Sequence, residues 1–138
     1  MEDIKIVASI VLYKNNPKIL ITTINSFLNS TLGSQLYLID NSPTNELKSL
    51  AEIEKRIVYI HNPSNPGFGA AHNIAIKKAI KLNAIYHFVI NPDVYFDVDV
   101  ITSMVNYMSN DASIGMLMPE VLNADGSIQN LPKLLPSP

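Results

Sequence analysis

Oxygen-rich side chains occur at two points where an aliphatic run of the sequence ends. One set is Asn91-Pro92-Asp93 and the other is Asp40-Asn41-Ser42. Mg²⁺ and Mn²⁺ prefer oxygen ligands, and Mg²⁺ often takes one or two carboxylates together with phosphates and water. Asp93 could supply the charge of such a site, and Asn91 could offer a neutral carbonyl oxygen. The carboxylate of Asp40 could accept the N3–H of a uracil or thymine ring.

Each of these segments also has a purely structural interpretation. Asp40-Asn41-Ser42 could be a turn, with Ser42-Pro43 capping the helix that follows. Asn91-Pro92-Asp93 could also be a plain turn, since the residue before a proline is driven to an extended conformation. The choice depends on whether other strands deliver polar residues to the same place.

Hydrophobic runs and helical spacing alternate along the chain. Strands are expected at residues 4–13, 35–39, 56–61, 86–90 and 114–118. Helices are expected after Asn16-Pro17, after Ser42-Pro43, after the loop at 62–69 and after Asp97, where Val98, Ile101, Val105 and Met108 would be buried. This alternation predicts repeated βαβ units, and therefore an α/β fold with a largely parallel sheet flanked by helices. Asn123–Ser127 predicts a hairpin turn.

Ligands of open α/β sheets bind outside the carboxyl ends of the strands. Four expected strands end in polar residues, which are Tyr13-Lys14-Asn15, Asp40-Asn41-Ser42, Asn65–Gly69 with His72 and Asn73, and Asn91-Pro92-Asp93. We therefore predict that these junctions meet at one edge of the sheet, where Asp40 and Asp93 face a single nucleotide.

Gly67–His72 resembles a dinucleotide fingerprint at first sight. His72 stands in place of the third glycine, however, and the loop follows the third strand instead of the first, which argues against an NAD site. Taken alone, His72 is more typical of a partly exposed helical residue than of a ligand.

Composition narrows the class of protein. The 138 residues are enough for one domain, and 47% hydrophobic with 16% charged residues indicates a packed interior. A net charge of −2 without a basic stripe argues against nucleic acid as a partner. The absence of cysteine fits a reducing compartment. The acidic amino end and the short apolar run after it predict a soluble cytoplasmic chain.

Taken together, the sequence blocks resemble family 2 glycosyltransferases, particularly their bacterial rhamnosyltransferase-like branch. The blocks in the order and spacing of that family are Val7–Asn15, Leu38–Ser42, Asn65–Asn73, Val89–Asp93 and Asn123–Gln129. Asn-Pro-Asp stands where Asp-x-Asp is commoner, and it is a variant known in that branch. The resemblance implies a GT-A-like (Rossmann-like) fold that binds a nucleotide-diphosphate sugar and transfers the sugar with inversion of its anomeric centre.

The resemblance also implies roles for single residues. The nucleotide-binding positions are Val11, Tyr13, Asp40, His72, Asn91 and Asp93. Val11 to Tyr13 would border the nucleobase, Asp40 would hydrogen-bond it, and His72, where many relatives carry arginine, would contact the base or a phosphate. Asp93 would bind the Mg²⁺ or Mn²⁺ ion that bridges the diphosphate, with Asn91 near the ribose or the metal. The ion would stabilise the charge on the departing diphosphate.

No general base is expected in this chain. Inversion by direct displacement needs a base for the acceptor hydroxyl, and in the family that residue lies downstream of a proline-rich segment, in the acceptor-binding half. No acidic residue follows Asp125, and Asp125 itself belongs to the expected hairpin turn. The resemblance therefore implies a nucleotide-sugar-binding half-domain at residues 1–130, cut short after the fifth strand and hairpin. A proline-rich tail at 131–138 would lead to a missing acceptor-binding half.

These expectations combine into one functional hypothesis and two alternatives. The hypothesis is an inverting glycosyltransferase of polysaccharide biosynthesis, of which this chain is the donor-binding part and inactive alone. Thymidine-diphosphate rhamnose is the donor that the branch suggests, and a glycan or lipid-linked molecule would be the acceptor. Peripheral binding to the inner face of the membrane and the formation of homo-oligomers are both left open. The first alternative is a non-catalytic nucleotide-binding or assembly module. A sugar-nucleotide synthesising enzyme ranks last, because Tyr13–Pro17 contains no glycine.

Overall fold

The computed structural model of the chain describes residues 4–31 and 33–129. The chain divides into two compact units, Met1–Ser103 and Met104–Pro138. The first unit contains the whole of the sheet and all the residues expected to bind a nucleotide. The expected tail at 131–138 and the domain boundary at residue 130 lie outside the described residues.

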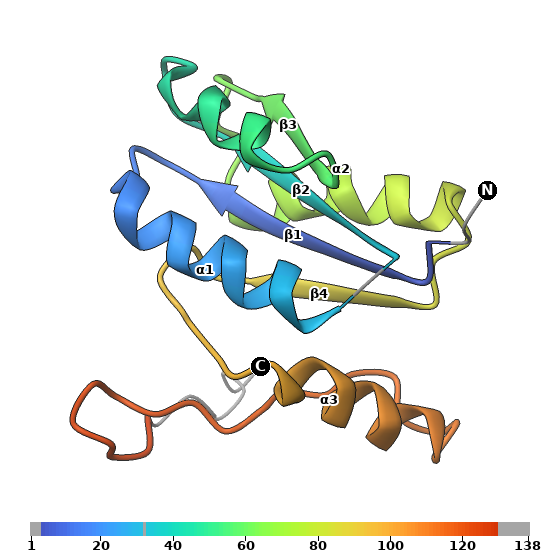
Figure 1. Cartoon of the computed structure of the whole chain (residues 1–138). Coiled ribbons are helices and arrows are strands. Elements are labelled where there is room, and N and C mark those ends of the chain that lie inside the picture. Colours follow the sequence, from blue (N-terminus) through green and yellow to red (C-terminus); the bar gives the residue numbers. More distant parts are fainter. Residues whose placement is uncertain (1–3, 32, 130–138) are drawn as a thin grey trace, which may run out of the picture. The chain divides into compact units, whose positions relative to one another are not determined.

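The sheet has four parallel strands in the order β3-β2-β1-β4 (Figure 1). The strands are β1 (Ile6–Leu12), β2 (Ser34–Asp40), β3 (Ile57–His61) and β4 (Tyr86–Ile90). β1 pairs with β2 along one side and with β4 along the other, all in parallel. The parallel α/β sheet predicted from the sequence is therefore confirmed, with strand ends within two residues of those expected.

Helices cover both faces of the sheet (Figure 1). α1 (Pro17–Ser30) and the short 3₁₀ helix η1 (Glu46–Ile53) lie on one face, and α2 (Phe68–Lys81) lies on the other. α2 presents a stripe of small residues at i, i+4 and i+8 to the strands, which are Ala71, Ala75 and Ala79. Because alanine adds little bulk, the helix can lie close against the core residues that β1 and β2 point toward it, which are Val7, Val11, Tyr37 and Ile39.

α1 begins as the sequence predicts. The side-chain oxygen of Asn16 accepts hydrogen bonds from the backbone N–H groups of Lys18 (2.9 Å) and Ile19 (3.4 Å), and Pro17 occupies the first helical position. These contacts satisfy two of the donors that a helix start leaves unpaired.

The predicted cap at Ser42-Pro43 is wrong. The next helix is η1, which begins only at Glu46 and has no side-chain cap. The physical reason is a long-range contact, because the Ser42 hydroxyl oxygen accepts the backbone N–H of Lys14 at 2.8 Å. That oxygen therefore serves the β1–α1 loop instead of a helix start.

The predicted fifth strand at Ile114–Met118 is also wrong, since this segment has no regular secondary structure. Met116 and Met118 are 90% and 58% exposed, so the apolar pattern there finds no sheet to join within the described residues. The helix after Asp97 does form, as α3 (Asp99–Ser109), but Ile101 is its only buried residue.

The hairpin turn expected at Asn123–Ser127 is confirmed. The N–H of Asn123 donates to the carbonyl of Ser127 at 2.7 Å, and Leu122 forms an antiparallel bridge with Ile128. Asp125 Oδ1 accepts the N–H of Ser127 at 2.9 Å, and Gly126 has the left-handed φ of +88° that this turn requires. Among residues 4–31 and 33–129, no helix is long and apolar enough to cross a membrane.

The cap at Asn16 leads to a stability prediction. Replacing Asn16 with Ala removes both of its hydrogen bonds, and we expect the free energy of unfolding to fall by about 1 kcal/mol. Urea denaturation followed by circular dichroism measures this change. Asn16→Asp is the matched control, because aspartate caps equally well, and an Asn16→Ala variant as stable as the control would contradict the assignment.

Candidate functional site

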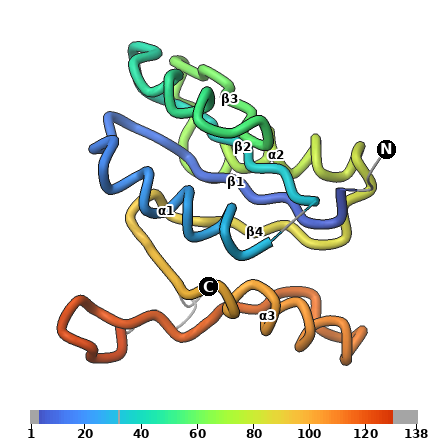
Figure 2. Tube along the Cα trace, viewed as in Figure 1, coloured from blue at the N-terminus to red at the C-terminus, as the bar shows by residue number. Residues whose placement is uncertain are grey.

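The direction of sheet growth reverses at β1. The chain lays β2 and β3 on one side of β1 and then returns to place β4 on the other side. Because all strands are parallel, their carboxyl ends lie at one edge, as the trace in Figure 2 shows. Such a reversal opens a crevice outside the strand ends, and ligands of α/β sheets bind there. We call the edge formed by the carboxyl ends of β1 to β4 the carboxyl rim.

The junctions after β1 and β2 are locked together at the carboxyl rim. The N–H of Asn41 donates to the carbonyl of Leu12 at 2.9 Å, and the Ser42 hydroxyl oxygen accepts the N–H of Lys14. The amide oxygen of Asn41 in turn accepts a hydrogen bond from the Asn62 side chain at 3.0 Å. Lys14 has a φ of +51°, a left-handed conformation that costs a non-glycine residue about 1 kcal/mol. These contacts hold the loop in that conformation before any ligand arrives.

The side chain of Tyr13, just after β1, is exposed, whereas that of Val11, within β1, is buried. The Tyr13 side chain is 51% exposed, and the ammonium nitrogen of Lys14 lies 5.4 Å from the centre of its ring. Val11 is only 9% exposed and packs in the core against α2. A ligand at this junction therefore meets an aromatic ring and a cation, while Val11 contributes packing beneath them.

Asp40 is fully buried and both of its carboxylate oxygens are occupied. Oδ1 accepts the N–H of Ser42 at 3.0 Å, and Oδ2 accepts a hydrogen bond from the Tyr59 hydroxyl. Burial, together with the neighbouring Asp40 carboxylate, raises the pKa of Tyr59, so the phenol stays protonated and remains a donor. In this arrangement Asp40 fixes the end of β2. A nucleobase could reach its carboxylate only if the Tyr59 hydroxyl moved.

Asn91 and Asp93 are both exposed, on the turn that leaves β4. Their turn is tied to α1 by Thr23, a wholly buried residue whose hydroxyl oxygen lies 2.6 Å from the carbonyl oxygen of Val94 and 3.0 Å from that of Pro92. The hydroxyl carries one proton, so it donates to one carbonyl at a time, and the shorter distance favours Val94. Thr23 was not predicted as a functional residue from the sequence, although a threonine within the apolar face of a helix is a visible irregularity.

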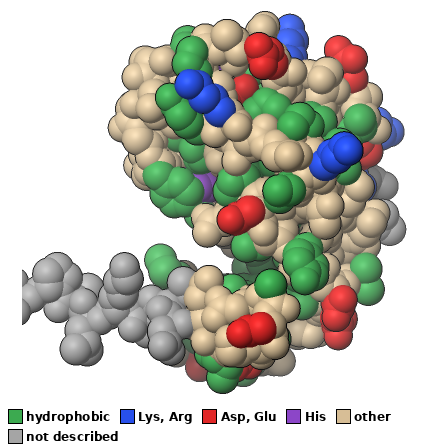
Figure 3. Space-filling model, turned by 90° about the vertical axis from the view of Figure 1, so that its left-hand side faces the viewer, with side chains coloured by type: hydrophobic (Ala, Val, Ile, Leu, Met, Phe, Trp, Pro, Cys, Tyr) green, Lys and Arg blue, Asp and Glu red, His purple; other side chains and the backbone are tan. Residues whose placement is uncertain are grey.

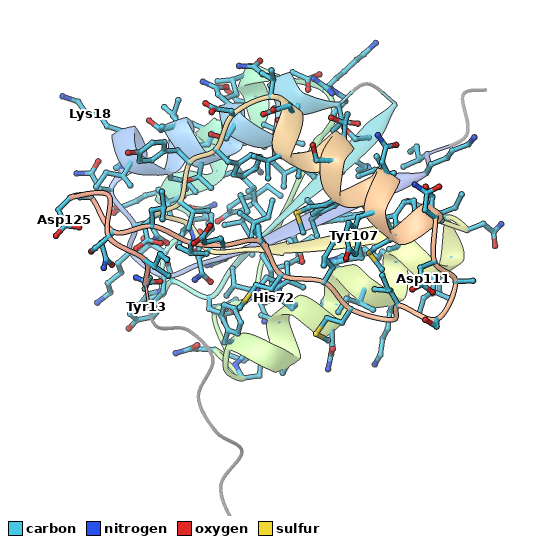
Figure 4. The ribbon with its side chains drawn as sticks, turned by 90° about the horizontal axis from the view of Figure 1, so that it is seen from below. Tyr13, Lys18, His72, Tyr107, Asp111 and Asp125 are labelled. Atoms are coloured by element: carbon cyan, nitrogen blue, oxygen red, sulfur yellow. The ribbon has the colours of Figure 1, made fainter. Side chains whose placement is uncertain are left out.

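His72 lies between α2 and the sheet, where Figure 4 labels it, and is 3% exposed. Its Nδ1 is 2.7 Å from the hydroxyl oxygen of Ser9 on β1, and the same oxygen is 2.7 Å from Nε2 of His87 on β4. The other ring nitrogen of each histidine is buried without a hydrogen-bond partner among the described residues. The ring is therefore not on the ligand-facing surface of the rim.

Both histidines of this cluster are neutral at pH 7. Burial lowers the pKa of His72, and burial together with the nearby His72 lowers the pKa of His87 to about 4. The Ser9 hydroxyl can donate to one ring and accept an N–H from the other, which satisfies all three side chains at their shared contact. Ser9 and His87 were missed in the sequence, although a serine inside the apolar run of β1 was a visible irregularity.

Metal binding at the rim would depend on few protein groups. The described residues contain no group of three or more His, Cys, Asp or Glu side chains that could hold a metal ion. Asp93 is an exposed carboxylate on the β4 turn, and Asn91 is an exposed amide beside it. This donor set fits an ion that takes most of its oxygen ligands from a bound diphosphate and water. Figure 3 looks toward this side of the molecule, where acidic and basic side chains are scattered without forming a patch of one sign.

The histidine cluster leads to a prediction about pH. Because the folded pKa of His87 lies below its unfolded value near 6.5, the unfolded chain binds more protons between these values. The contribution of neutral His87 to the free energy of unfolding is therefore fully present above pH 6.5. It is lost as the pH falls toward 4. We expect a loss of about 2 kcal/mol, less than the full shift implies because the ring is only partly buried.

Urea denaturation at a series of pH values between 7 and 4.5 measures this loss. His87→Gln removes the titrating ring and should flatten the profile in this window. His61→Gln is the control, because His61 is exposed and lies outside the cluster. Parallel profiles for the His87→Gln variant and the unaltered chain would show that the cluster does not control acid stability.

The contact between Thr23 and the β4 turn leads to a prediction about local order. Thr23→Val keeps the shape of the side chain but removes the donor, so the carbonyls of Pro92 and Val94 lose their tie to α1. We expect hydrogen exchange in the peptide 91–98 to accelerate about tenfold, the equivalent of roughly 1.4 kcal/mol of local opening energy. Thr23→Ser keeps the hydroxyl and should exchange slowly. Equal exchange in the two variants would mean that the hydroxyl does not hold this turn.

Comparison with known proteins places the chain in a family. A sequence model described as Glycosyl transferase family 2 matches residues 9–127. The chain is similar in structure to TarS of S. aureus: a crystal structure of TarS residues 1–349 superposes with a TM-score of 0.65 at 15% identity, covering 79% of this chain and 33% of that one. A second TarS crystal structure gives a TM-score of 0.60 at 15% identity, covering 78% of this chain and 20% of that one.

The likeness to TarS shows a shared GT-A-like fold, and this chain spans about a third or less of the length of the TarS chains. No curated protein matches the chain in sequence. The family match extends from within β1 to the hairpin turn, and so includes every junction of the carboxyl rim. The chain belongs to glycosyl transferase family 2.

Proposed function

We propose that this chain binds the donor of an inverting glycosyltransferase, and that a nucleotide-diphosphate sugar occupies the carboxyl rim between β1 and β4. The observation that carries this proposal is the reversal of the sheet order at β1, which brings the exposed Tyr13 and the exposed Asn91 and Asp93 to neighbouring strand ends. The family supports a nucleotide sugar as the ligand class.

The two strand ends would hold different parts of the donor. The Tyr13 ring offers an apolar surface to the nucleobase, and Lys14 beside it offers a positive charge. Asp93 would bind Mg²⁺ or Mn²⁺, with the Asn91 amide near the ribose or the ion. When bound, the ion supplies positive charge to the diphosphate as it departs.

Asp40, Val11 and His72 would support the nucleotide from beneath. Val11 borders the base through its backbone, since its side chain is in the core. Asp40 would contact the base after the Tyr59 hydroxyl releases Oδ2, and until then it fixes the loop that carries Ser42. His72 would hold the first turns of α2 against β1 through Ser9, and so position the glycine-containing loop that precedes the helix.

Transfer itself belongs to a longer protein in this proposal. A base for the acceptor hydroxyl and an acceptor-binding part are required, and among the described residues we assign no side chain to the role of base. Thymidine-diphosphate rhamnose is the donor that the sequence resemblance favours, and a glycan or lipid-linked acceptor at the inner face of the membrane completes the proposal.

A second candidate is a non-catalytic assembly module. Large exposed apolar side chains lie near the end of α2 (Ile80, 68%), just before β4 (Ile85, 62%) and on the outer strand β4 (Val89, 54%). Association with another protein surface would follow if these side chains form one continuous patch. Gel filtration that shows a stable oligomer, together with no affinity for nucleotides, would favour this candidate.

Isothermal titration with uridine and thymidine diphosphates tests the proposed donor site. We expect binding that is strengthened by Mn²⁺. Asp93→Ala should weaken binding in Mn²⁺ about tenfold or more, which corresponds to roughly 1.4 kcal/mol. Asp97→Ala is the matched control, because it removes an exposed carboxylate four residues further along the same segment and should change affinity less than about twofold. Binding by the Asp93→Ala variant equal to that of the control would rule out the proposed metal site.

A further inference from the structure

A groove of about 520 Å³ lies along the exposed side of α1, next to the turn that follows β4. One wall is formed by the α1 residues Thr22, Asn25, Ser26 and Asn29, and the other by residues 96–98. None of Tyr13, Asp40, Asn91 and Asp93 lines the groove. All lining residues belong to the first unit of the chain.

The two walls are joined by half-buried hydrogen bonds. The Ser26 hydroxyl oxygen accepts the N–H of Phe96 at 3.3 Å, and the Thr23 hydroxyl reaches the carbonyl of Val94 at 2.6 Å. The groove is therefore built into the packing of α1 against the segment that follows β4. A ligand would find it formed in advance, which reduces the entropy lost on binding.

The α1 wall is made of polar side chains without charge. The positions 22, 25, 26 and 29 follow the i, i+3, i+4, i+7 spacing of one face, and all four side chains are neutral hydrogen-bonding groups. Exposed helix faces carry charged or polar residues, but this face has no charge and consists of Asn, Ser and Thr, which are poor helix formers that each cost a few tenths of a kcal/mol. Helix stability therefore does not explain this wall.

Three exposed polar side chains of the groove have no hydrogen-bond partner among the described residues, and these are Asn25, Asn29 and Asp97. The hydroxyls of Thr22 and Ser26, in contrast, donate back to α1 carbonyls, at 3.2 and 3.0 Å. Each free amide offers two donors and one acceptor oxygen, and the carboxylate accepts. The free groups can therefore both give and receive hydrogen bonds with a ligand.

This set of groups selects a class of ligand. No Lys, Arg or His lines the groove, and Asp97 adds a negative charge, so an anion such as phosphate is disfavoured. Phe96 and the 63% exposed Val98 provide an apolar side, while the amides face it from α1. A sugar ring has the matching character, with hydroxyl groups at its edges and C–H groups on its faces. The volume falls in the range of small-ligand sites, about 300–1,000 Å³.

We propose that this groove binds a short stretch of a neutral glycan through Asn25, Asn29 and Asp97. The identification of that glycan as the acceptor, held outside the proposed nucleotide site, rests on the proposed function. The binding itself does not, because it uses residues that take no part in nucleotide binding. A docked protein segment would use the apolar side more than the amides, and the free amide groups favour the sugar.

Nuclear magnetic resonance of the ¹⁵N-labelled chain tests the proposal, because the side-chain amides of Asn25 and Asn29 give their own signals. The probes are the methyl glycosides of glucose, galactose, N-acetylglucosamine and rhamnose, at millimolar concentrations, with inorganic phosphate as the anionic control. We expect at least one glycoside, and not phosphate, to shift both amide signals in a saturable way. Asp97→Ala should weaken that binding about fivefold or more, while Asp93→Ala should leave it unchanged.

Uridine diphosphate with Mg²⁺ is added to the same samples to separate this proposal from the donor site. Shifts at Asn91 and Asp93 with the nucleotide, but none at Asn25 and Asn29 with any glycoside, would overturn the glycan groove and leave the donor site standing. Glycoside shifts without a nucleotide response would do the reverse. Concentration-dependent broadening of the Asn25 and Asn29 signals in the absence of sugar would identify a protein interface, and that result would also overturn the proposal.

Discussion

The placement of β1 between β2 and β4 is the constraint on which the rest of the structure depends. β1 is an almost wholly buried strand with parallel neighbours on both sides. β2 pairs with one edge of β1, and β3 follows on the far side of β2. After β3 the chain must therefore cross back over the sheet to add β4 at the other edge of β1. That return leaves the junctions after β1 and β4 side by side, without a connection between them. The carboxyl rim is thus a consequence of strand order before any side chain is considered.

Buried polar side chains then shape the rim from within. Ser42 holds the loop after β1, Thr23 holds the turn after β4, and Asp40 is fixed by Ser42 and Tyr59. Each is a buried polar side chain at a position where an apolar side chain would be expected from packing alone. The exposed residues of the rim are consequently those free to meet a ligand, and the buried ones set where those residues point. Asp40 and His72, both predicted to contact the nucleotide, are among these buried side chains.

The sequence allowed prediction of the features that depend on local pattern. The apolar runs located the four strands, and their alternation with helices indicated a parallel sheet. Asn16-Pro17 located the start of α1, and Asn123–Ser127 located the hairpin turn. The features that failed depend on distant partners. Ser42 looked like a helix cap because its contact with Lys14 spans 28 positions, and the Ser9 contacts with His72 and His87 span 63 and 78. Ile114–Met118 has a strand-like composition, but a strand forms only where a neighbour pairs with it.

We propose that a nucleotide and its divalent ion occupy the carboxyl rim between β1 and β4. Paramagnetic broadening by Mn²⁺ tests it directly, in a ¹⁵N-labelled chain saturated with uridine or thymidine diphosphate. The backbone signals of Tyr13, Lys14, Asn91 and Asp93 should broaden first, while those at the opposite ends of the strands, such as Ser34 and Tyr86, should stay sharp. Broadening centred on the amino ends of the strands, or spread evenly over the chain with nucleotide bound, would contradict the account.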